Sequence, residues 1–89
     1  MSNYETVIFT PEFLQTFADK VFSHAERQRF LRALDILDEN EKHPSLRVHQ
    51  LQGNLQGQWS ASASDALRIT FERVEGGKKR LVACSRHYQ

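Results

Sequence analysis

A chain of 89 residues can bury one small core, so two domains are excluded and a single domain over residues 1–89 is expected. Hydrophobic residues make up 39% of the sequence and charged residues 26%, which excludes a disordered tail. Residues 1–45 hold five basic and eight acidic side chains, whereas residues 46–89 hold seven basic and three acidic ones. The second half is therefore the part expected to meet a polyanion.

The first half of the chain predicts one strand and two helices. The stretch from Tyr4 to Phe9 is rich in β-branched and aromatic residues and predicts the strand. Thr10 as N-cap followed by Pro11 and Glu12 predicts the start of a helix. Ser23 and Glu26 have the spacing of a capping box, so a second helix is expected to begin there and to end at Pro44. The residues expected on the buried faces are Phe13, Leu14, Phe17 and Val21 in the first helix and Phe30, Leu34 and Leu37 in the second.

The second half changes from a helical to an alternating pattern, which predicts strands. Four are expected, at Leu46–Leu51, Gln58–Ser64, Ala66–Val74 and Lys79–Arg86, with a hairpin turn at Glu75-Gly76-Gly77-Lys78. The order β-α-α-β-β-β-β predicts an α+β fold in which two helices pack on a mainly antiparallel, twisted sheet.

Alternation along these strands divides their side chains between two faces. Leu67, Ile69 and Phe71 are expected to face the helices, as is Trp59, for which a place in the core is favoured over base stacking. The opposite face is expected to be a solvated polar platform made by Ser60, Ser62, Arg68 and Thr70.

Four short motifs in the second half resemble one family. They are Val48-His49-Gln50-Leu51-Gln52-Gly53, Gly57-Gln58-Trp59-Ser60, Leu67-Arg68-Ile69-Thr70-Phe71 and the terminal His87. In this order they are similar to the toxins of the RelE/ParE superfamily, most of all to HigB-like and RelE-like mRNA interferases. The resemblance covers residues 46–88.

The resemblance implies a toxin of a type II toxin-antitoxin system, a metal-independent endoribonuclease that cuts mRNA on the translating ribosome. Its implied partners are a cognate antitoxin, mRNA and ribosomal RNA, with no cofactor and no membrane. The sequence starts with neither a signal peptide nor an apolar span, so the cytoplasm is expected.

Such a reaction needs proton transfer and stabilisation of a phosphate as charge builds on it. His49 and His87 are the candidates for proton transfer, and Arg68 is the candidate for binding the phosphate, unless it pairs with Glu72 or Asp65. Tyr88 is a further candidate for an aromatic group at the site. The candidates for RNA contacts are Arg47, Arg73, Lys79 and Arg86.

Some positions depart from the HigB pattern. Ser85 and Arg86 stand where that family has an acidic and an aromatic residue, and Gln52 and Ser64 replace basic ones. Two alternatives therefore stay open: a ParE-like toxin that poisons DNA gyrase, and a non-enzymatic module that only binds an antitoxin.

Three further features have a structural interpretation. Arg27, Arg29 and Arg32 are expected to form a solvated helix face, since acidic residues follow them closely. Cys84 lies in an apolar run and is expected to be a buried, unreactive residue. The histidines form no close ligand pair, which argues against a zinc site.

Overall fold

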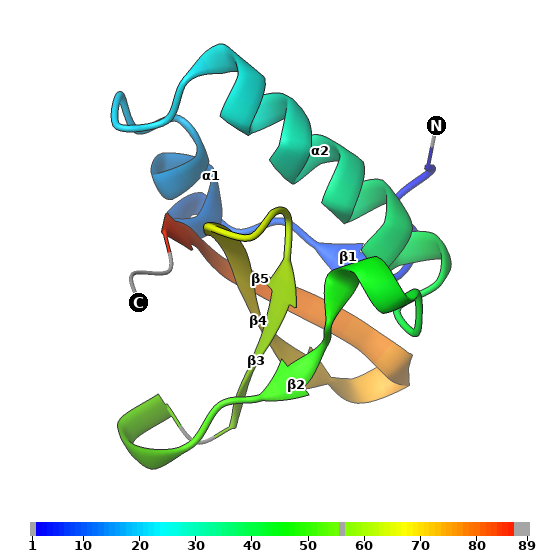
Figure 1. Ribbon diagram of the computed structural model, residues 1–89. Coiled ribbons are helices and arrows are strands. Elements are labelled where there is room, and N and C mark those ends of the chain that lie inside the picture. Colours follow the sequence, from blue (N-terminus) through cyan, green and yellow to red (C-terminus); the bar gives the residue numbers. More distant parts are fainter. Residues whose placement is uncertain (1, 56, 87–89) are drawn as a thin grey trace.

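Two helices pack on one face of a five-stranded sheet (Figure 1). The computed structural model describes residues 2–55 and 57–86. Its elements are β1 (Val7–Ile8), α1 (Pro11–Phe17), α2 (His24–Glu39), β2 (His49–Gln50), β3 (Gln58–Ser62), β4 (Leu67–Val74) and β5 (Lys78–Arg86). The strand order is β1-β5-β4-β3-β2, with β1 parallel to β5 and all other neighbours antiparallel. The predicted α+β fold and order of elements are confirmed.

Helix α2 is specified locally at its start and by burial along its length. The Ser23 hydroxyl accepts the N–H of Glu26, while the Glu26 carboxylate accepts the N–H of Ser23 at 2.9 Å, so the predicted capping box is formed. The helix ends before Asn40 and not at Pro44, because Asn40 leaves the helical region at φ −156°. Pro44 instead opens a short 3₁₀ turn, where a proline at the first position loses no hydrogen bond. The buried residues of α2 are Phe30, Ala33, Leu34 and Leu37.

Helix α1 begins as predicted, with the Thr10 hydroxyl accepting the N–H of Phe13, but it stops after seven residues. The carbonyls at its end, those of residues 17, 18 and 19, accept the Arg27 guanidinium at 2.8, 3.2 and 2.7 Å. Arg27 is therefore a structural bracket between the helices, and its assignment to a solvated face was wrong. Leu14 and Val21 are 49% and 56% exposed, contrary to prediction, because a two-turn helix buries only a narrow stripe and Val21 lies beyond it.

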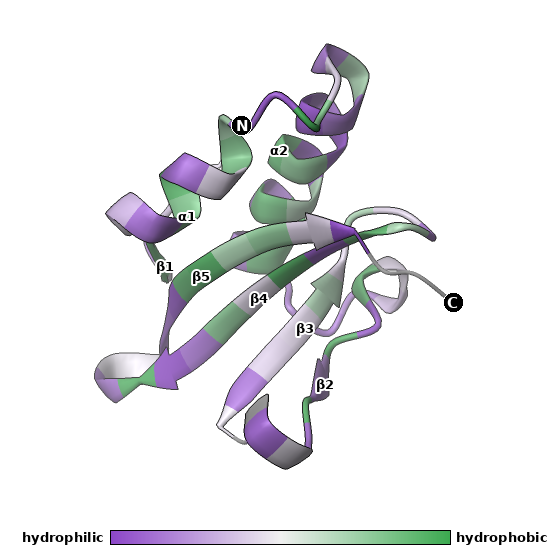
Figure 2. Cartoon of the chain, turned by 90° about the vertical axis from the view of Figure 1, so that its left-hand side faces the viewer, coloured by the Kyte–Doolittle hydropathy of each residue, from purple (hydrophilic) through white to green (hydrophobic). Residues whose placement is uncertain are grey.

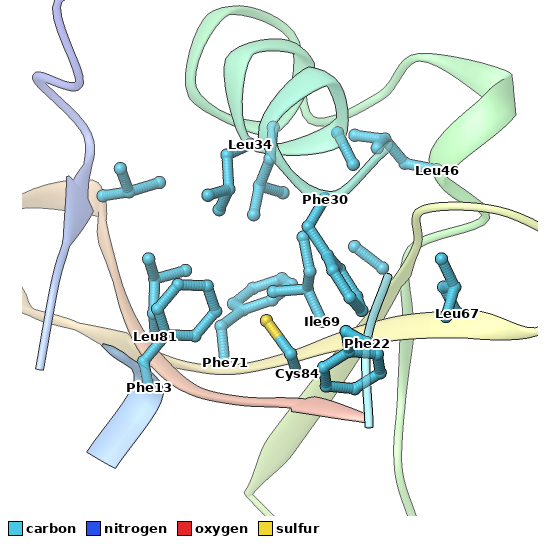
Figure 3. Close-up of a cluster of buried hydrophobic side chains, with 14 residues drawn as sticks. Phe13, Phe22, Phe30, Leu34, Leu46, Leu67, Ile69, Phe71, Leu81 and Cys84 are labelled. Atoms are coloured by element: carbon cyan, nitrogen blue, oxygen red, sulfur yellow. The ribbon is translucent and has the colours of Figure 1, made fainter. Parts of the chain in front are cut away.

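The core fills the space between the helices and the sheet (Figure 3). Phe13 from α1 and Phe30 from α2 lie against Phe71 of β4 and Leu81 of β5, and all four are almost completely buried. Each such side chain stabilises the fold by about 1.5–3 kcal/mol. Cys84 is buried as predicted, and burial raises the pKa of its thiol to about 12. One face of the sheet is thus occupied by the core, and ligands must use the other face or an edge.

The strand predicted over Tyr4–Phe9 is reduced to the two residues of β1. The backbone N–H of Thr6 donates to the Asp38 carboxylate of α2 at 2.7 Å, and that of Glu5 donates to it at 3.3 Å. The Tyr4 hydroxyl donates to Asp35 at 2.6 Å. The N–H groups of this segment therefore donate to helix α2, while the Thr6 carbonyl still accepts the N–H of Lys79 in β5, and Asp38 is the tertiary partner that the strand pattern did not reveal.

Strand β2 is also shorter than the predicted Leu46–Leu51. Leu46 belongs to the 3₁₀ turn and is buried in the core, and Arg47 follows with φ +48°. A left-handed residue interrupts an extended chain, so β2 begins only at His49. No helix within the described residues is long and apolar enough to cross a membrane.

Candidate active site on the outer face of the sheet

The strand register brings the predicted polar residues into two rows on the face away from the helices. His49, Ser60 and Thr70 are paired across β2, β3 and β4, and Ser62 is paired with Arg68 and, through it, with Ser85. Directly opposed residues of antiparallel strands share a face, with neighbouring strands about 4.8 Å apart. Figure 2 shows these strands side by side.

This face is less open to solvent than predicted. Ser60 and Ser62 are only 5% and 7% exposed, so the expectation that they lie on a solvated platform was wrong. Their short side chains lie on β3, between larger groups of β2 and β4. The residues above them form a shallow pocket of about 360 Å³, lined by His49, Leu51, Ser60, Arg68, Thr70, Ser85 and Arg86. The pocket brings the predicted proton-transfer residue His49 and the predicted phosphate ligand Arg68 together.

His49 is held in one tautomer by the backbone. Its Nδ1 lies 2.9 Å from the carbonyl oxygen of Arg47. A carbonyl only accepts hydrogen bonds, so Nδ1 carries the hydrogen, and the neutral ring then has its lone pair on Nε2. The left-handed conformation of Arg47 sets the direction of this carbonyl. Because the His49 side chain is exposed, Nε2 can accept a proton from a ligand in the pocket.

Arg68 is held by backbone carbonyls and not by a carboxylate. Its Nη1 donates to the carbonyl of Ser64 at 2.6 Å and to that of Leu67 at 3.0 Å. The alternative partners are engaged elsewhere: Glu72 accepts from Arg80, and Asp65 lies 3.8 Å from Arg47. Within the described part of the chain, Nε and Nη2 of Arg68 donate no hydrogen bond. The guanidinium is thus fixed at one nitrogen, and its remaining donors can bind an anion.

Three of the four candidate RNA contacts, Arg73, Lys79 and Arg86, have other roles. Arg73 makes a two-pronged ion pair with Glu41 at 3.1 and 2.6 Å, and its guanidinium lies 4.3 Å from the centre of the half-buried Trp59 ring. Lys79 is 3% exposed, and its Nζ bonds to the Thr6 hydroxyl at 3.0 Å. A buried ammonium cannot reach a phosphate, so the interpretation of Lys79 as an RNA contact was wrong.

Arg86 lines the pocket but fastens the end of β5 to α2. It forms a two-pronged pair with Glu26 at 2.5 and 2.7 Å, donates to the carbonyl of Val21 at 2.8 Å and lies over the Phe22 ring. The hydrogen bond from Arg86, with a further one from Ser23, lowers the pKa of Glu26 to about 2. Sequence reasoning missed this pair, because residues 60 positions apart carry no local signal of contact.

The remaining candidates, His87 and Tyr88, lie outside the described residues. Leu51 and Ser85 line the pocket although neither was proposed as a site residue, and strand alternation is the signal that would have indicated Ser85. Within residues 2–55 and 57–86, no three His, Cys, Asp or Glu side chains are grouped as metal ligands.

The sequence matches no known family model and no curated protein. Solved structures match over nearly the whole chain. A YoeB/ParE toxin from Agrobacterium tumefaciens is 14% identical with a TM-score of 0.71, and the match covers 93% of this chain and 99% of that one. YafQ from Escherichia coli is 14% identical with a TM-score of 0.64, covering 91% of both chains. The toxin-antitoxin complex RelBE2 from Mycobacterium tuberculosis gives 18% identity and a TM-score of 0.60, covering 92% of this chain and 96% of that one. The chain therefore shares the fold of these solved toxin structures.

Proposed function

We propose that this protein is the toxin of a type II toxin-antitoxin system and that it cleaves mRNA on the translating ribosome without a metal ion. The observation that carries the proposal is the outer-face pocket, which is lined by both His49, whose Nδ1 is bonded to the backbone, and Arg68, whose guanidinium is held by backbone carbonyls. The likeness to solved YoeB, YafQ and RelBE2 toxins supports it at the level of the fold.

In the proposed reaction, Nε2 of His49 takes the proton of an RNA 2′-hydroxyl, and the resulting oxygen attacks the adjacent phosphorus. Arg68 donates from Nε and Nη2 to the non-bridging oxygens as negative charge builds on them. The bond from phosphorus to the 5′-oxygen breaks, giving a 2′,3′-cyclic phosphate. We assign protonation of the leaving 5′-oxygen to His87, which directly follows the pocket residue Arg86 in the sequence. Tyr88 is proposed to contact a base.

Fewer residues are proposed as RNA contacts than the sequence suggested. Arg47 is exposed and its ion pair with Asp65 is long, so its guanidinium is available to a phosphate. Arg73 and Arg86 are held by Glu41 and Glu26, and we assign them structural roles. Ribosomal RNA and mRNA remain the proposed polyanions.

The proposed protein partner is an antitoxin that covers the β1 edge of the sheet. Strand β1 has only two residues, and its Ile8 and the following Phe9 are 37% and 40% exposed. An exposed edge strand with apolar neighbours can accept an extended segment of another chain. The solved RelBE2 structure and a YoeB-YefM structure from Staphylococcus aureus are toxin-antitoxin complexes. Expression without a cognate antitoxin should stop bacterial growth, and normal growth with abundant folded protein would count against the toxin assignment.

The decisive experiment adds the purified protein to a translating extract and maps cuts in the message. We expect cleavage that resists chelator and leaves a 2′,3′-cyclic phosphate. A message with 2′-O-methyl groups at the cut sites should stay whole, because its attacking oxygen is blocked. His49→Gln and His87→Gln should each lower the rate by about a hundredfold or more while the circular dichroism spectrum is unchanged.

Two results would overturn this assignment. If both glutamine variants cut at the wild-type rate, the proposed residues are wrong. If the wild type cuts nothing, the function changes: inhibition of DNA supercoiling by gyrase would then support the ParE-like alternative, and no effect on either system would leave an antitoxin-binding module.

A further inference from the structure

A second concave surface lies next to the pocket, between α2 and the turn that joins β3 to β4. In Figure 1 this turn, drawn in yellow, lies beside α2. The hollow has a volume of about 320 Å³. Its rim carries three arginines, Arg29 and Arg32 from α2 and Arg47 from the end of the 3₁₀ turn. We call it the arginine hollow.

The arginines of this hollow lack strong partners. Within the described residues, Arg29 and Arg32 make no hydrogen bond or ion pair. Arg47 lies 3.8 Å from the carboxylate of Asp65 in the lining, and both side chains are largely exposed, so solvent weakens this pair. Arg27, two residues before Arg29 on α2, donates to three backbone carbonyls. The contrast within one helix leaves positive charge at the hollow that the fold does not use.

The arginine hollow is continuous with the proposed active site. Ser64 lines the hollow, and its carbonyl holds the Arg68 guanidinium in the pocket. Arg47 lines the hollow, and its carbonyl holds the His49 ring. Ser62 lines the hollow and is the cross-strand neighbour of Arg68. A polymer that leaves the pocket past Arg68 therefore has to cross only the β3–β4 turn to reach the hollow.

We infer that the arginine hollow binds backbone phosphates of a single-stranded RNA on one side of the cut, an inference that rests on the proposed function. Guanidinium groups bind phosphates through paired hydrogen bonds, and three arginines on one rim can hold adjacent phosphates. The floor is apolar, with Ala33, Ile36 and Leu46, and suits the face of a ribose or base. An acidic segment of a protein partner is the competing occupant, and continuity with the pocket favours RNA over it.

The test measures RNA binding separately from cleavage. The probe is a fluorescent single-stranded RNA of about twelve nucleotides, 2′-O-methylated throughout so that it cannot be cut, and anisotropy gives its affinity for the full chain. The test variant is Arg29→Ala with Arg32→Ala. Its matched control is Lys20→Ala with Lys78→Ala, which removes the same charge from two exposed residues outside the hollow.

We expect the arginine pair to reduce the affinity by about tenfold or more and the control pair by less than about threefold. The slope of log affinity against log salt should fall by about 0.7 for each phosphate that is no longer neutralised, and so by roughly 1.4 for the arginine pair. Arg29→Lys with Arg32→Lys should keep most of the salt slope, because both charges remain.

Three results would overturn the inference. One is an equal loss of affinity in the arginine and control pairs, and another is a wild type that does not bind the probe at low salt. The third is binding of a polyglutamate of similar length with the same arginine dependence but without RNA binding, which would mark a site for an acidic protein. If the protein binds the probe through these arginines but cuts no message, the proposed nuclease activity is wrong and the RNA-binding role of the arginine hollow stands.

Discussion

The two ends of the sheet both carry basic residues, but these residues have different partners at each end. At the end with the β4–β5 hairpin, Arg73 and Lys79 lie beside Glu41, and Arg80 is paired with Glu72. At the end with the β3–β4 turn, Arg68 is held by carbonyls and Arg47 makes a long contact with Asp65. Apart from the exposed Lys78 at the first end and Arg86, paired with Glu26, at the second, the positive charge is thus neutralised by the fold at one end and offered to a ligand at the other.

The difference has a measurable electrostatic cause. Hydrogen bonds from Arg73 hold the pKa of Glu41 below its usual value, and the same bonds raise the pKa of Arg73. Charges that stabilise each other within the protein attract an external phosphate weakly, since the field of one cancels that of the other. The formal charge of a segment therefore overstates what a polyanion meets.

The largest expected contrast is in catalysis. Arg68→Ala should lower the rate of mRNA cleavage by about a hundredfold or more, through weaker stabilisation of the transition state. Arg73→Ala, which removes the same charge at the opposite end of β4, should change it by less than about threefold. Single-turnover cleavage on ribosomes, corrected for the folded fraction, measures both. Equal losses would mean that the sheet acts only through its total charge.

Stability should show the reverse order. Glu41→Ala removes the carboxylate beside the buried ammonium of Lys79 and leaves the Thr6 hydroxyl as its partner, so we expect a loss of about 1–3 kcal/mol in the free energy of unfolding. Urea denaturation measures it. Glu75→Ala, in the exposed hairpin turn, is the control for the loss of one carboxylate and should cost less than about 0.5 kcal/mol. A Glu41 variant as stable as this control would show that Lys79 does not need its carboxylate.

Acid should loosen the turn end through Glu26. Its pKa is about 2 in the folded protein against an ordinary value of 4.5. The Glu26–Arg86 pair therefore stabilises the fold at pH values above about 4.5. This contribution is lost as the pH falls from about 4.5 toward 2. The difference in unfolding free energy between wild type and Glu26→Gln should therefore shrink between about pH 6 and pH 3 in urea titrations. A difference that stays constant over this range would assign the effect of the variant to something other than the ion pair.

The smallest effect is expected in the arginine hollow. Arg29→Ala with Arg32→Ala breaks no described hydrogen bond or ion pair, so the free energy of unfolding should change by less than about 0.5 kcal/mol for each substitution. The melting temperature of this double variant should be compared with that of Arg27→Ala. Because the Arg27 guanidinium caps α1, its removal should lower the melting temperature clearly. A marked loss of stability in the hollow pair would indicate structural roles for both arginines.

Local chemistry allowed much of the fold to be predicted. Thr10 and Ser23 accept the N–H groups of the helix starts that follow them, and alternation in β4 placed Leu67, Ile69 and Phe71 in the core and Arg68 on the other face. These features depend on neighbours within a few residues, which a sequence displays directly. The expectation that His49 and Arg68 act at one site came from the family resemblance and not from local chemistry.

Tertiary contacts decided which charges remain available and where the strands end. Glu26 binds Arg86, and Glu41 binds Arg73, although both carboxylates lie dozens of residues before their partners. Asp38 accepts the N–H of Thr6, so β1 begins only at Val7, and the carbonyl of Arg47 selects the His49 tautomer. The sequence by itself determined the helix starts, the alternation and the residue types at the site. The state of each charge depended on partners that only the packing of α2 against the sheet brings within reach, because hydrogen bonds and ion pairs act over a few ångströms and carry no trace in sequence spacing.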